Sequence, residues 1–131
     1  MASKISFDLV SPEKLLLSAE ADMVTVPGTE GYMGVMAGHS PVVTTLRAGM
    51  IDVNANGKDD RYFIRGGFAE IGPAKITVLA EEAIPMTELD LAVLDRRISD
   101  AQEDELAAEN DTDRQKAAQM VDDLKLVRAA F

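Results

Sequence analysis

The sequence of 131 residues contains no cysteine, no tryptophan and only one histidine. Without cysteine there is no disulfide and no thiolate chemistry, and a single histidine cannot build the usual Cys/His zinc site. No segment approaches the ~18 consecutive apolar residues that a membrane-spanning helix requires. The sequence therefore predicts a protein without a metal or a cofactor that does not insert directly into a membrane.

Positive charge is also scarce, because 13 lysines and arginines stand against 23 aspartates and glutamates, and the net charge is −10. An acidic surface repels the phosphate backbone of nucleic acids and does not attract anionic lipid headgroups. We therefore expect protein partners and no nucleic acid. The first residues lack the apolar segment of a secretory signal, which favours a cytosolic or cytosol-facing location.

Glycine and proline are missing from the last 46 residues, although the chain contains nine glycines and five prolines. All of them lie between residues 12 and 85. This break in composition predicts a domain boundary near Pro85. We expect an N-terminal domain over residues 1–86 and a C-terminal domain over residues 87–131.

The N-terminal domain has the pattern of short β-strands separated by turns. Ile5, Phe7 and Leu9 alternate with polar residues, which is the period of a half-buried strand. Asn56-Gly57 is a strong hairpin signal, because a type I′ turn needs two positive φ angles. Further turns are predicted at Pro27-Gly28, Gly38–Pro41, Arg47–Gly49, Gly66-Gly67 and Gly72-Pro73. About eight to ten short antiparallel strands at this spacing predict a β-sandwich or flattened barrel.

The C-terminal domain changes to a helical period. Thr87 and Asp90 resemble a capping box, and Asp111 or Thr112 can cap a second helix. Apolar residues then recur every three or four positions, which gives each helix one apolar stripe. The stripes comprise Leu91, Leu94, Ile98 and Ala101 in the first helix and Ala117, Met120, Val121, Leu124 and Val127 in the second. Two such helices with a short polar joint predict an antiparallel hairpin.

No residue pattern supports catalysis. The only base that could activate a serine is His39, and its place between Gly38 and Pro41 favours a rigid turn over a nucleophilic triad. Adjacent carboxylates, such as Asp59-Asp60, Glu81-Glu82 and Asp122-Asp123, point in different directions and are expected to be solvated surface charge. No Walker A sequence is present either. We therefore predict no catalytic residue.

The residues from Val26 to Arg47 read V-P-G-T-E-G-Y-M-G-V-M-A-G-H-S-P-V-V-T-T-L-R. This run resembles the epsilon subunit family of the rotary, F-type ATP synthase, in its bacterial form. Four further segments resemble the family in order and spacing, namely Phe7–Glu13, the predicted turn Leu46–Gly49, Tyr62–Ile71 and Thr77–Ile84. The family fold is an N-terminal β-sandwich followed by two C-terminal helices, which agrees with the periodicity.

The resemblance implies a non-catalytic subunit of the central stalk, which is part of the rotor of the proton-translocating ATP synthase. Such a subunit links the gamma subunit to the c ring and so helps to couple proton flow to ATP synthesis. By resemblance, the c-ring contact falls on Thr29, Glu30, Gly31 and Tyr32, and the gamma contact falls on His39, Ser40, Pro41 and Val42. A peripheral location on the cytoplasmic face of the bacterial inner membrane is implied as well.

The helices depart from those family members that bind ATP. Such members carry the motif [IL]-D-x-x-R-A on the first helix. Here Leu89 and Asp90 match the start of the motif, but Val93 stands at the position of the arginine. The hairpin also carries twelve acidic and six basic side chains, which opposes an anionic ligand. The sequence therefore predicts that the chain does not bind ATP with physiological affinity.

The second helix offers few basic residues for an inhibitory contact with the alpha/beta catalytic head, so we expect this regulatory role to be weak. The residues available are Arg114, Lys116, Lys125 and Arg128.

Two functions of other classes compete with the rotor subunit. The first is a free-standing β-sandwich that binds a ligand or protein and carries a helical tail. Carbohydrate-binding modules usually present several aromatic faces, whereas this chain has only two tyrosines and no tryptophan. The second is a small hydrolase, for which His39 would have to be the base. Co-purification with a catalytic head distinguishes a rotor subunit from both.

Overall fold

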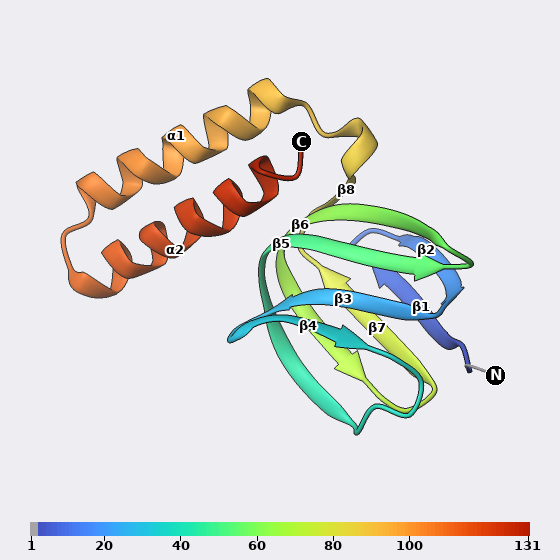
Figure 1. Cartoon of the computed structure of the whole chain (residues 1–131). Coiled ribbons are helices and arrows are strands. Elements are labelled where there is room, and N and C mark those ends of the chain that lie inside the picture. The colour runs from blue at the N-terminus through green and yellow to red at the C-terminus, as the bar shows by residue number, and fades with distance from the viewer. Residues whose placement is uncertain (1–2) are drawn as a thin grey trace. The chain divides into compact units, whose positions relative to one another are not determined.

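The computed structural model of the chain describes residues 3–131. The chain divides into two compact units, the first ending at Thr87 and the second running from Glu88 to Phe131. The first unit is built of strands and the second of two helices (Figure 1).

Within the described residues, the strand unit contains eight strands, and a short 3-10 helix, η1, spans the boundary between the two units. They are β1 (Ile5–Val10), β2 (Leu15–Ala21), β3 (Met23–Gly28), β4 (Gly31–Val35), β5 (Val42–Ala55), β6 (Lys58–Ile71), β7 (Lys75–Ala80), β8 (Ala83–Pro85) and η1 (Met86–Glu88). The strands follow the order β2-β1-β7-β6-β5-β3-β4, and β8 also pairs with β6. The sheet is not closed, because β2 and β4 lie at its two ends. The predicted β-sandwich is confirmed.

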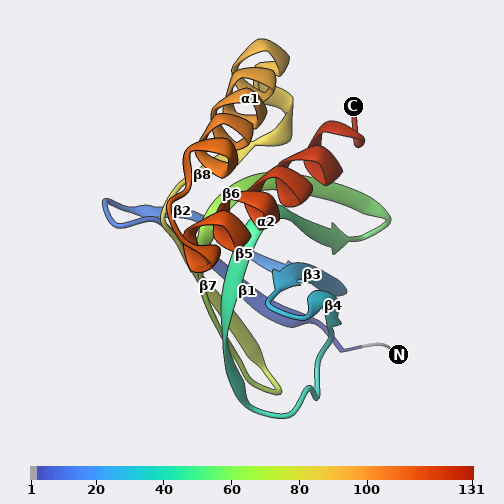
Figure 2. The same ribbon diagram turned by 90° about the vertical axis from the view of Figure 1, so that its left-hand side faces the viewer.

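Two long strands, β5 and β6, join the two layers of the sandwich. The first part of β5 pairs with the last part of β6, which in turn pairs with β7. The remaining part of β5 pairs with β3, and the corresponding part of β6 pairs with β8. Each of these strands has 14 residues, enough to continue from one layer into the other. The curvature of both strands is visible in Figures 1 and 2.

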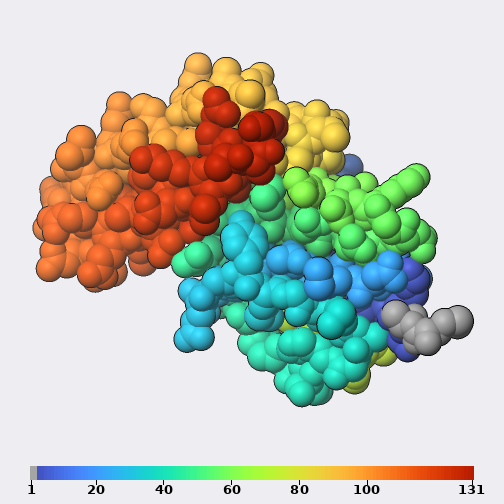
Figure 3. Space-filling view, in the orientation of Figure 1, coloured from blue at the N-terminus to red at the C-terminus, as the bar shows by residue number. Residues whose placement is uncertain are grey.

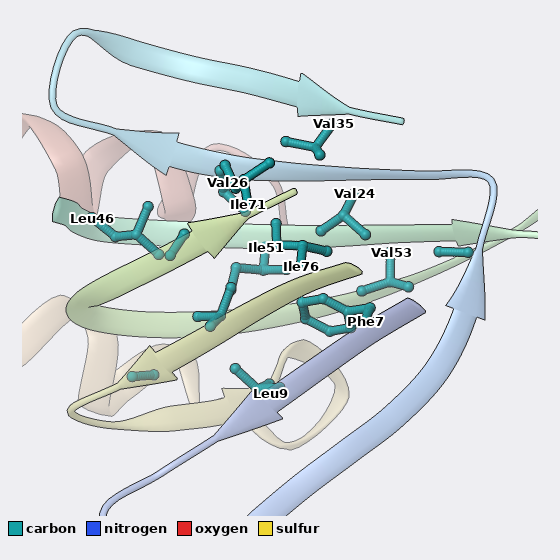
Figure 4. Close-up of a cluster of buried hydrophobic side chains, with 14 of the residues drawn as sticks. Phe7, Leu9, Val24, Val26, Val35, Leu46, Ile51, Val53, Ile71 and Ile76 are labelled. Atoms are coloured by element: carbon teal, nitrogen blue, oxygen red, sulfur yellow. The ribbon is translucent and has the colours of Figure 1, made fainter. Parts of the chain in front are cut away.

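The hydrophobic core of this unit collects apolar side chains from β1 to β7. Phe7 is fully buried, and Ile51, Ile76 and Val24 lie around the same interior (Figure 4). On β1, buried and half-buried residues alternate, as the sequence predicted. Complete burial of a side chain of this size stabilises the fold by roughly 1.5–3 kcal/mol. A core drawn from so many strands makes the sandwich a rigid support for its loops.

Three sequence-based predictions about the strands were wrong. Arg47–Gly49 lies inside β5, and Gly66-Gly67 lies inside β6, so neither segment is a turn. Pro27 and Gly28 end β3, and the turn follows at Thr29 and Glu30. These glycines and prolines allow bends and close approaches within strands. By contrast, the turn at Asn56-Gly57 is confirmed, with φ angles of 55° and 77°.

One strand pair is also not antiparallel as predicted. β1 and β7 are parallel neighbours, with Phe7 opposite Ile76. Five strands separate them in the sequence, so no hairpin turn fixes their relative direction. The remaining pairs are antiparallel.

The helical unit is a hairpin of α1 (Leu91–Ala107) and α2 (Asp111–Arg128). Asp90, not Thr87, caps α1, because its side chain accepts a hydrogen bond from the backbone N–H of Ala92 at 2.8 Å. Asn110 caps α2 in the same way through the N–H of Asp113, which places this cap one residue earlier than predicted. The polar residue preceding each helix therefore satisfies a backbone donor of its first turn.

The predicted apolar stripes account for most of the buried side chains of the helices. Those buried are Leu94 and Ala101 on α1 and Val121, Leu124 and Val127 on α2. An exception is Asp123, which was predicted to be solvated but is only 4% exposed. Its carboxylate accepts a hydrogen bond from Gln119 Nε2 at 2.9 Å, one helical turn earlier. A charged group at a buried position needs such a partner.

Candidate functional site

The first candidate contact is the turn between β3 and β4. Gly28 pairs with Gly31, so Thr29 and Glu30 form a two-residue loop, and both are exposed. Gly31 has a φ of 132°, which favours glycine. Figure 3 shows the tip of this hairpin, in light blue, projecting from the surface of the strand unit. The four predicted c-ring residues are therefore adjacent at an exposed tip.

A shallow hollow of about 290 Å³ lies at this tip. Its lining comprises Gly28, Thr29, Glu30, Gly31, Tyr32, Met33 and Thr44. Thr44 belongs to β5, so the hollow brings a residue from beyond the predicted segment to the site. Its volume lies at the lower limit of pockets that hold drug-sized ligands.

Tyr32 differs from the other residues of the tip. Its side chain is 43% exposed, yet its hydroxyl accepts a hydrogen bond from the backbone N–H of Met50 at 3.1 Å. Gly49 and Pro27 lie against it, and both are buried. Tyr32 therefore makes contacts within the sandwich as well as facing solvent.

The second candidate contact is the segment between β4 and β5, residues 36–41, which Figure 2 shows running down to the start of β5. The backbone N–H of Gly38 donates to the carbonyl of Pro73 at 2.7 Å, and that of His39 donates to the carbonyl of Met36 at 3.2 Å. The first bond holds the segment to the turn that connects β6 and β7, and the second closes a turn within the segment itself. The predicted turn around His39 is thus a constrained structure.

The predicted gamma-contact residues lie together on this segment. His39 is half-buried, and its Nδ1 lies 2.7 Å from the carbonyl oxygen of Ser40. Since a carbonyl oxygen only accepts, Nδ1–H is the donor there. Ser40, Pro41 and Val42 are exposed. The imidazole therefore has a local structural role, and the surface of the segment is formed mainly by the three residues after it.

Two larger hollows adjoin this segment, and both include Pro73 and Ala74. One has a volume of about 510 Å³ and includes Pro41 and Lys75 in its lining. The other has a volume of about 520 Å³ and includes Met36 and Gly38. The turn between β6 and β7 was predicted from the sequence, but not as part of a candidate site. Its Gly72-Pro73 pair was visible only as a turn signal, because the contact with residue 38 is long-range.

The third candidate site is the degenerate nucleotide motif. Asp90 is engaged as the cap of α1, and Leu89 is 8% exposed. Val93 is 45% exposed, so the position at which the motif has arginine presents an apolar side chain to solvent. This geometry offers an anion no guanidinium at that position.

Within residues 3–131, no group of acidic, histidine or cysteine side chains is arranged to hold a metal ion. In the same residues, no helix is both long enough and apolar enough to cross a membrane.

The strand unit presents two loops with constrained backbones, one at each end of β4. Strand pairing closes the first loop, and backbone hydrogen bonds hold the second. A rigid sandwich that presents such loops, followed by a helical hairpin, defines a class of binding or assembly subunit.

A family model described as ATP synthase, Delta/Epsilon chain, beta-sandwich domain matches residues 4–86. The ATP synthase epsilon chain of Parvibaculum lavamentivorans is 54% identical over 129 residues, which cover 98% of each chain. That of Mesorhizobium japonicum is 46% identical over 132 residues, which cover 100% of this chain and 98% of the relative. The chain belongs to the ATP synthase delta/epsilon family, and both of these relatives, which match over nearly their full length, are epsilon chains.

Solved structures agree with this assignment. A chain of the mitochondrial ATP synthase of Euglena gracilis, in an assembly of OSCP, F1 and c-ring, has a TM-score of 0.80 and 26% identity, and covers 99% of this chain and 82% of that one. A chain from the central stalk and c-ring of the Tetrahymena thermophila mitochondrial ATP synthase has a TM-score of 0.64 and 11% identity, and covers 95% of this chain and 96% of that one. At this identity the likeness shows the fold alone.

Membership of the family confirms the prediction of a non-catalytic ATP synthase subunit and decides against the free-standing module. The subunit is a peripheral part of a membrane-bound synthase.

Proposed function

We propose that this chain joins the gamma subunit to the c ring in the rotor of a bacterial ATP synthase, at the cytoplasmic face of the inner membrane. The c ring would bind the tip at Thr29–Tyr32, and gamma would bind the segment His39–Val42. Family membership supports the general role, and the arrangement of the two loops supports this assignment of contacts.

The observation that carries the proposal is that one short strand connects the two loops. β4 begins at Gly31, next to the proposed c-ring contact, and ends at Val35, shortly before the proposed gamma contact. A strand of this length spans roughly 17 Å, at about 3.4 Å per residue. Because β4 is hydrogen-bonded to β3 and the core is packed, the two contacts can move only together. That property suits a part that transmits torque.

We propose a minor role for the helical unit. Two of the four basic residues of α2 are already engaged within the hairpin, because Arg114 pairs with Asp111 and Arg128 Nε lies 2.9 Å from Asp95 Oδ1. A contact with the alpha/beta catalytic head would have to compete with these ion pairs. We therefore propose that inhibition through the helices is weak.

Site-specific cross-linking tests the assignment of contacts. Since the chain has no cysteine, Glu30→Cys and Ser40→Cys each introduce a single thiol. In the assembled synthase, a short cross-linker should join position 30 to the c subunit and position 40 to gamma. Lys58→Cys, beside the Asn56-Gly57 turn, is the control and should join neither. The opposite pattern, or products with neither partner in a complex that contains the chain, would overturn the assignment.

A further inference from the structure

We infer that Tyr32 is a positioning residue, which fixes the β3–β4 hairpin to β5 and thereby holds the turn at Thr29 and Glu30 in place. This inference rests on the proposed function, because it concerns the mechanical support of the proposed c-ring contact. It assigns Tyr32 a role different from that of a simple contact residue.

The pairing of β3 with β5 is interrupted beneath the tip. Thr25 is opposite Asp52, but the next described pair is Gly28 with Leu46. Val26 and Pro27 therefore face residues 47–51 of β5 outside the regular register. Pro27 has no N–H to donate, so it cannot contribute a ladder bond from its own nitrogen. The hairpin is thus less firmly paired to β5 just before its tip.

The hydroxyl of Tyr32 makes a bond to β5 within this interruption. In the sheet, β3 lies between β4 and β5. Tyr32, on β4, nevertheless accepts a hydrogen bond from the N–H of Met50, on β5. The tyrosine side chain reaches past β3 and gives this backbone donor an acceptor. One side chain therefore links the two strands that flank β3.

Gly49 provides the space for this link. A Cβ atom added at Gly49 would lie 2.6 Å from Tyr32 Oη and 3.0 Å from Pro27 Cβ. The first distance is shorter than Cβ atoms adopt and the second is tighter than most of their contacts, so a larger residue would displace the tyrosine or the proline. We call the set of Pro27, Tyr32, Gly49 and Met50 the Tyr32 lock. It contains residues of three strands.

The mechanical consequence follows from where the lock lies. Without it, a force on the tip would reach β5 mainly through the regular β3–β5 pairs at Met23–Thr25 and the single pair at Gly28. With it, the tip is also attached at Met50. Since β5 begins at Val42, in the proposed gamma contact, the lock provides a second connection between the two contacts.

Hydrogen exchange tests whether the lock exists in solution. Tyr32→Phe keeps the ring and removes the hydroxyl, so the amide of Met50 should exchange about fivefold faster in the full-length chain. The amide of Phe7, in the core, reports global unfolding, so its rate in the same variant shows how much of the change at Met50 comes from a loss of global stability. Thr25→Val, which removes a hydroxyl from the same hairpin, is the matched control. An unchanged rate at Met50 in Tyr32→Phe would overturn the lock.

A second measurement tests whether the lock matters for coupling. In assembled synthase with equal amounts of bound chain, Tyr32→Phe should lower the ratio of protons pumped to ATP hydrolysed, and Thr25→Val should not. Glu30→Pro distorts the tip itself and serves as the reference. If Glu30→Pro uncouples and Tyr32→Phe does not, the positioning role is wrong and the proposed contact stands. If neither uncouples, the proposed contact is wrong as well.

Discussion

The carboxylate of Asp22 accepts a hydrogen bond from the backbone N–H of Asn56 at 2.9 Å. The same carboxylate lies 2.6 Å from Lys4 Nζ, which also donates to the side chain of Asn56 at 2.9 Å. These contacts join the corner between β2 and β3 to the tip of the β5–β6 hairpin. The hydrogen bond from Lys4, and then that from the N–H of Asn56, hold the pKa of Asp22 below its ordinary value. Three segments distant in sequence therefore depend on one ionised carboxylate.

This dependence predicts a specific pH profile. Because the pKa of Asp22 is lowered in the folded state, its stabilising effect is fully present above the unfolded-state pKa of about 3.9. It is lost as the pH falls through the lower folded-state pKa. Asp22→Asn should therefore lower the urea midpoint at pH 7. The difference in midpoint from wild type should shrink as the pH falls below about 3.9 and through the lower folded-state pKa of Asp22. Asp60→Asn, with the same change of charge on β6, is the control. A difference that stays constant down to acid pH contradicts the role of this carboxylate.

A second prediction concerns the bend in β6 at Gly67. This residue has a φ of 147°, and a Cβ atom there would lie 2.0 Å from the carbonyl oxygen of Leu79 on the paired strand. Backbone cannot move aside as a flexible side chain can. Gly67→Ala should therefore cost more than about 3 kcal/mol of unfolding free energy or prevent folding.

Gly57→Ala is the matched control for Gly67→Ala. Gly57 also has a positive φ, but a Cβ atom there meets nothing within 4 Å. We expect only the conformational cost of about 1–2 kcal/mol. Chemical denaturation of both variants makes the comparison, and equal losses of stability would show that the close approach to Leu79 is unimportant.

Local geometry explains which features could be predicted from the sequence. Asn56-Gly57 was predicted correctly, because a type I′ turn is determined by the φ angles of those two residues alone. Gly49 was misread as part of a turn, because its small size serves a long-range contact with Tyr32. The capping role of Thr87 was wrong because Asp90 itself is positioned to cap α1. Short-range requirements are visible in a single sequence, whereas space left for a distant residue is not.

The candidate site shows the same distinction. The spacing of glycine and proline indicated two loops with defined turns. Which partner each loop contacts was inferred only from the family resemblance. The attachment of Gly38 to Pro73 and that of Tyr32 to Met50 join residues far apart in the sequence. Neither pair has a chemical signature in the sequence, because the first joins two backbone groups and the second joins a side chain to a backbone group.

Truncation tests the independence of the strand unit. A chain that ends at Thr87 retains every described strand and the core drawn from β1 to β7. A unit of this size commonly folds alone. We expect β-type circular dichroism, a cooperative thermal transition and retained binding to gamma. The full-length chain is the control, and a fragment that lacks a cooperative transition would contradict the independence of this unit.

The final prediction is that the full-length chain does not bind ATP with physiological affinity. Val93 replaces the arginine of the ATP-binding motif and is exposed, and the hairpin carries twice as many acidic as basic side chains. Each charge-assisted hydrogen bond contributes roughly 1.5–3 kcal/mol, so loss of two or three weakens binding by several orders of magnitude. Isothermal titration with magnesium-ATP should therefore give no detectable heat. An epsilon chain that carries the complete motif is the positive control. Micromolar affinity in this chain would mean that other cations, such as Arg96, replace the missing arginine, and Arg96→Gln should then abolish the heat.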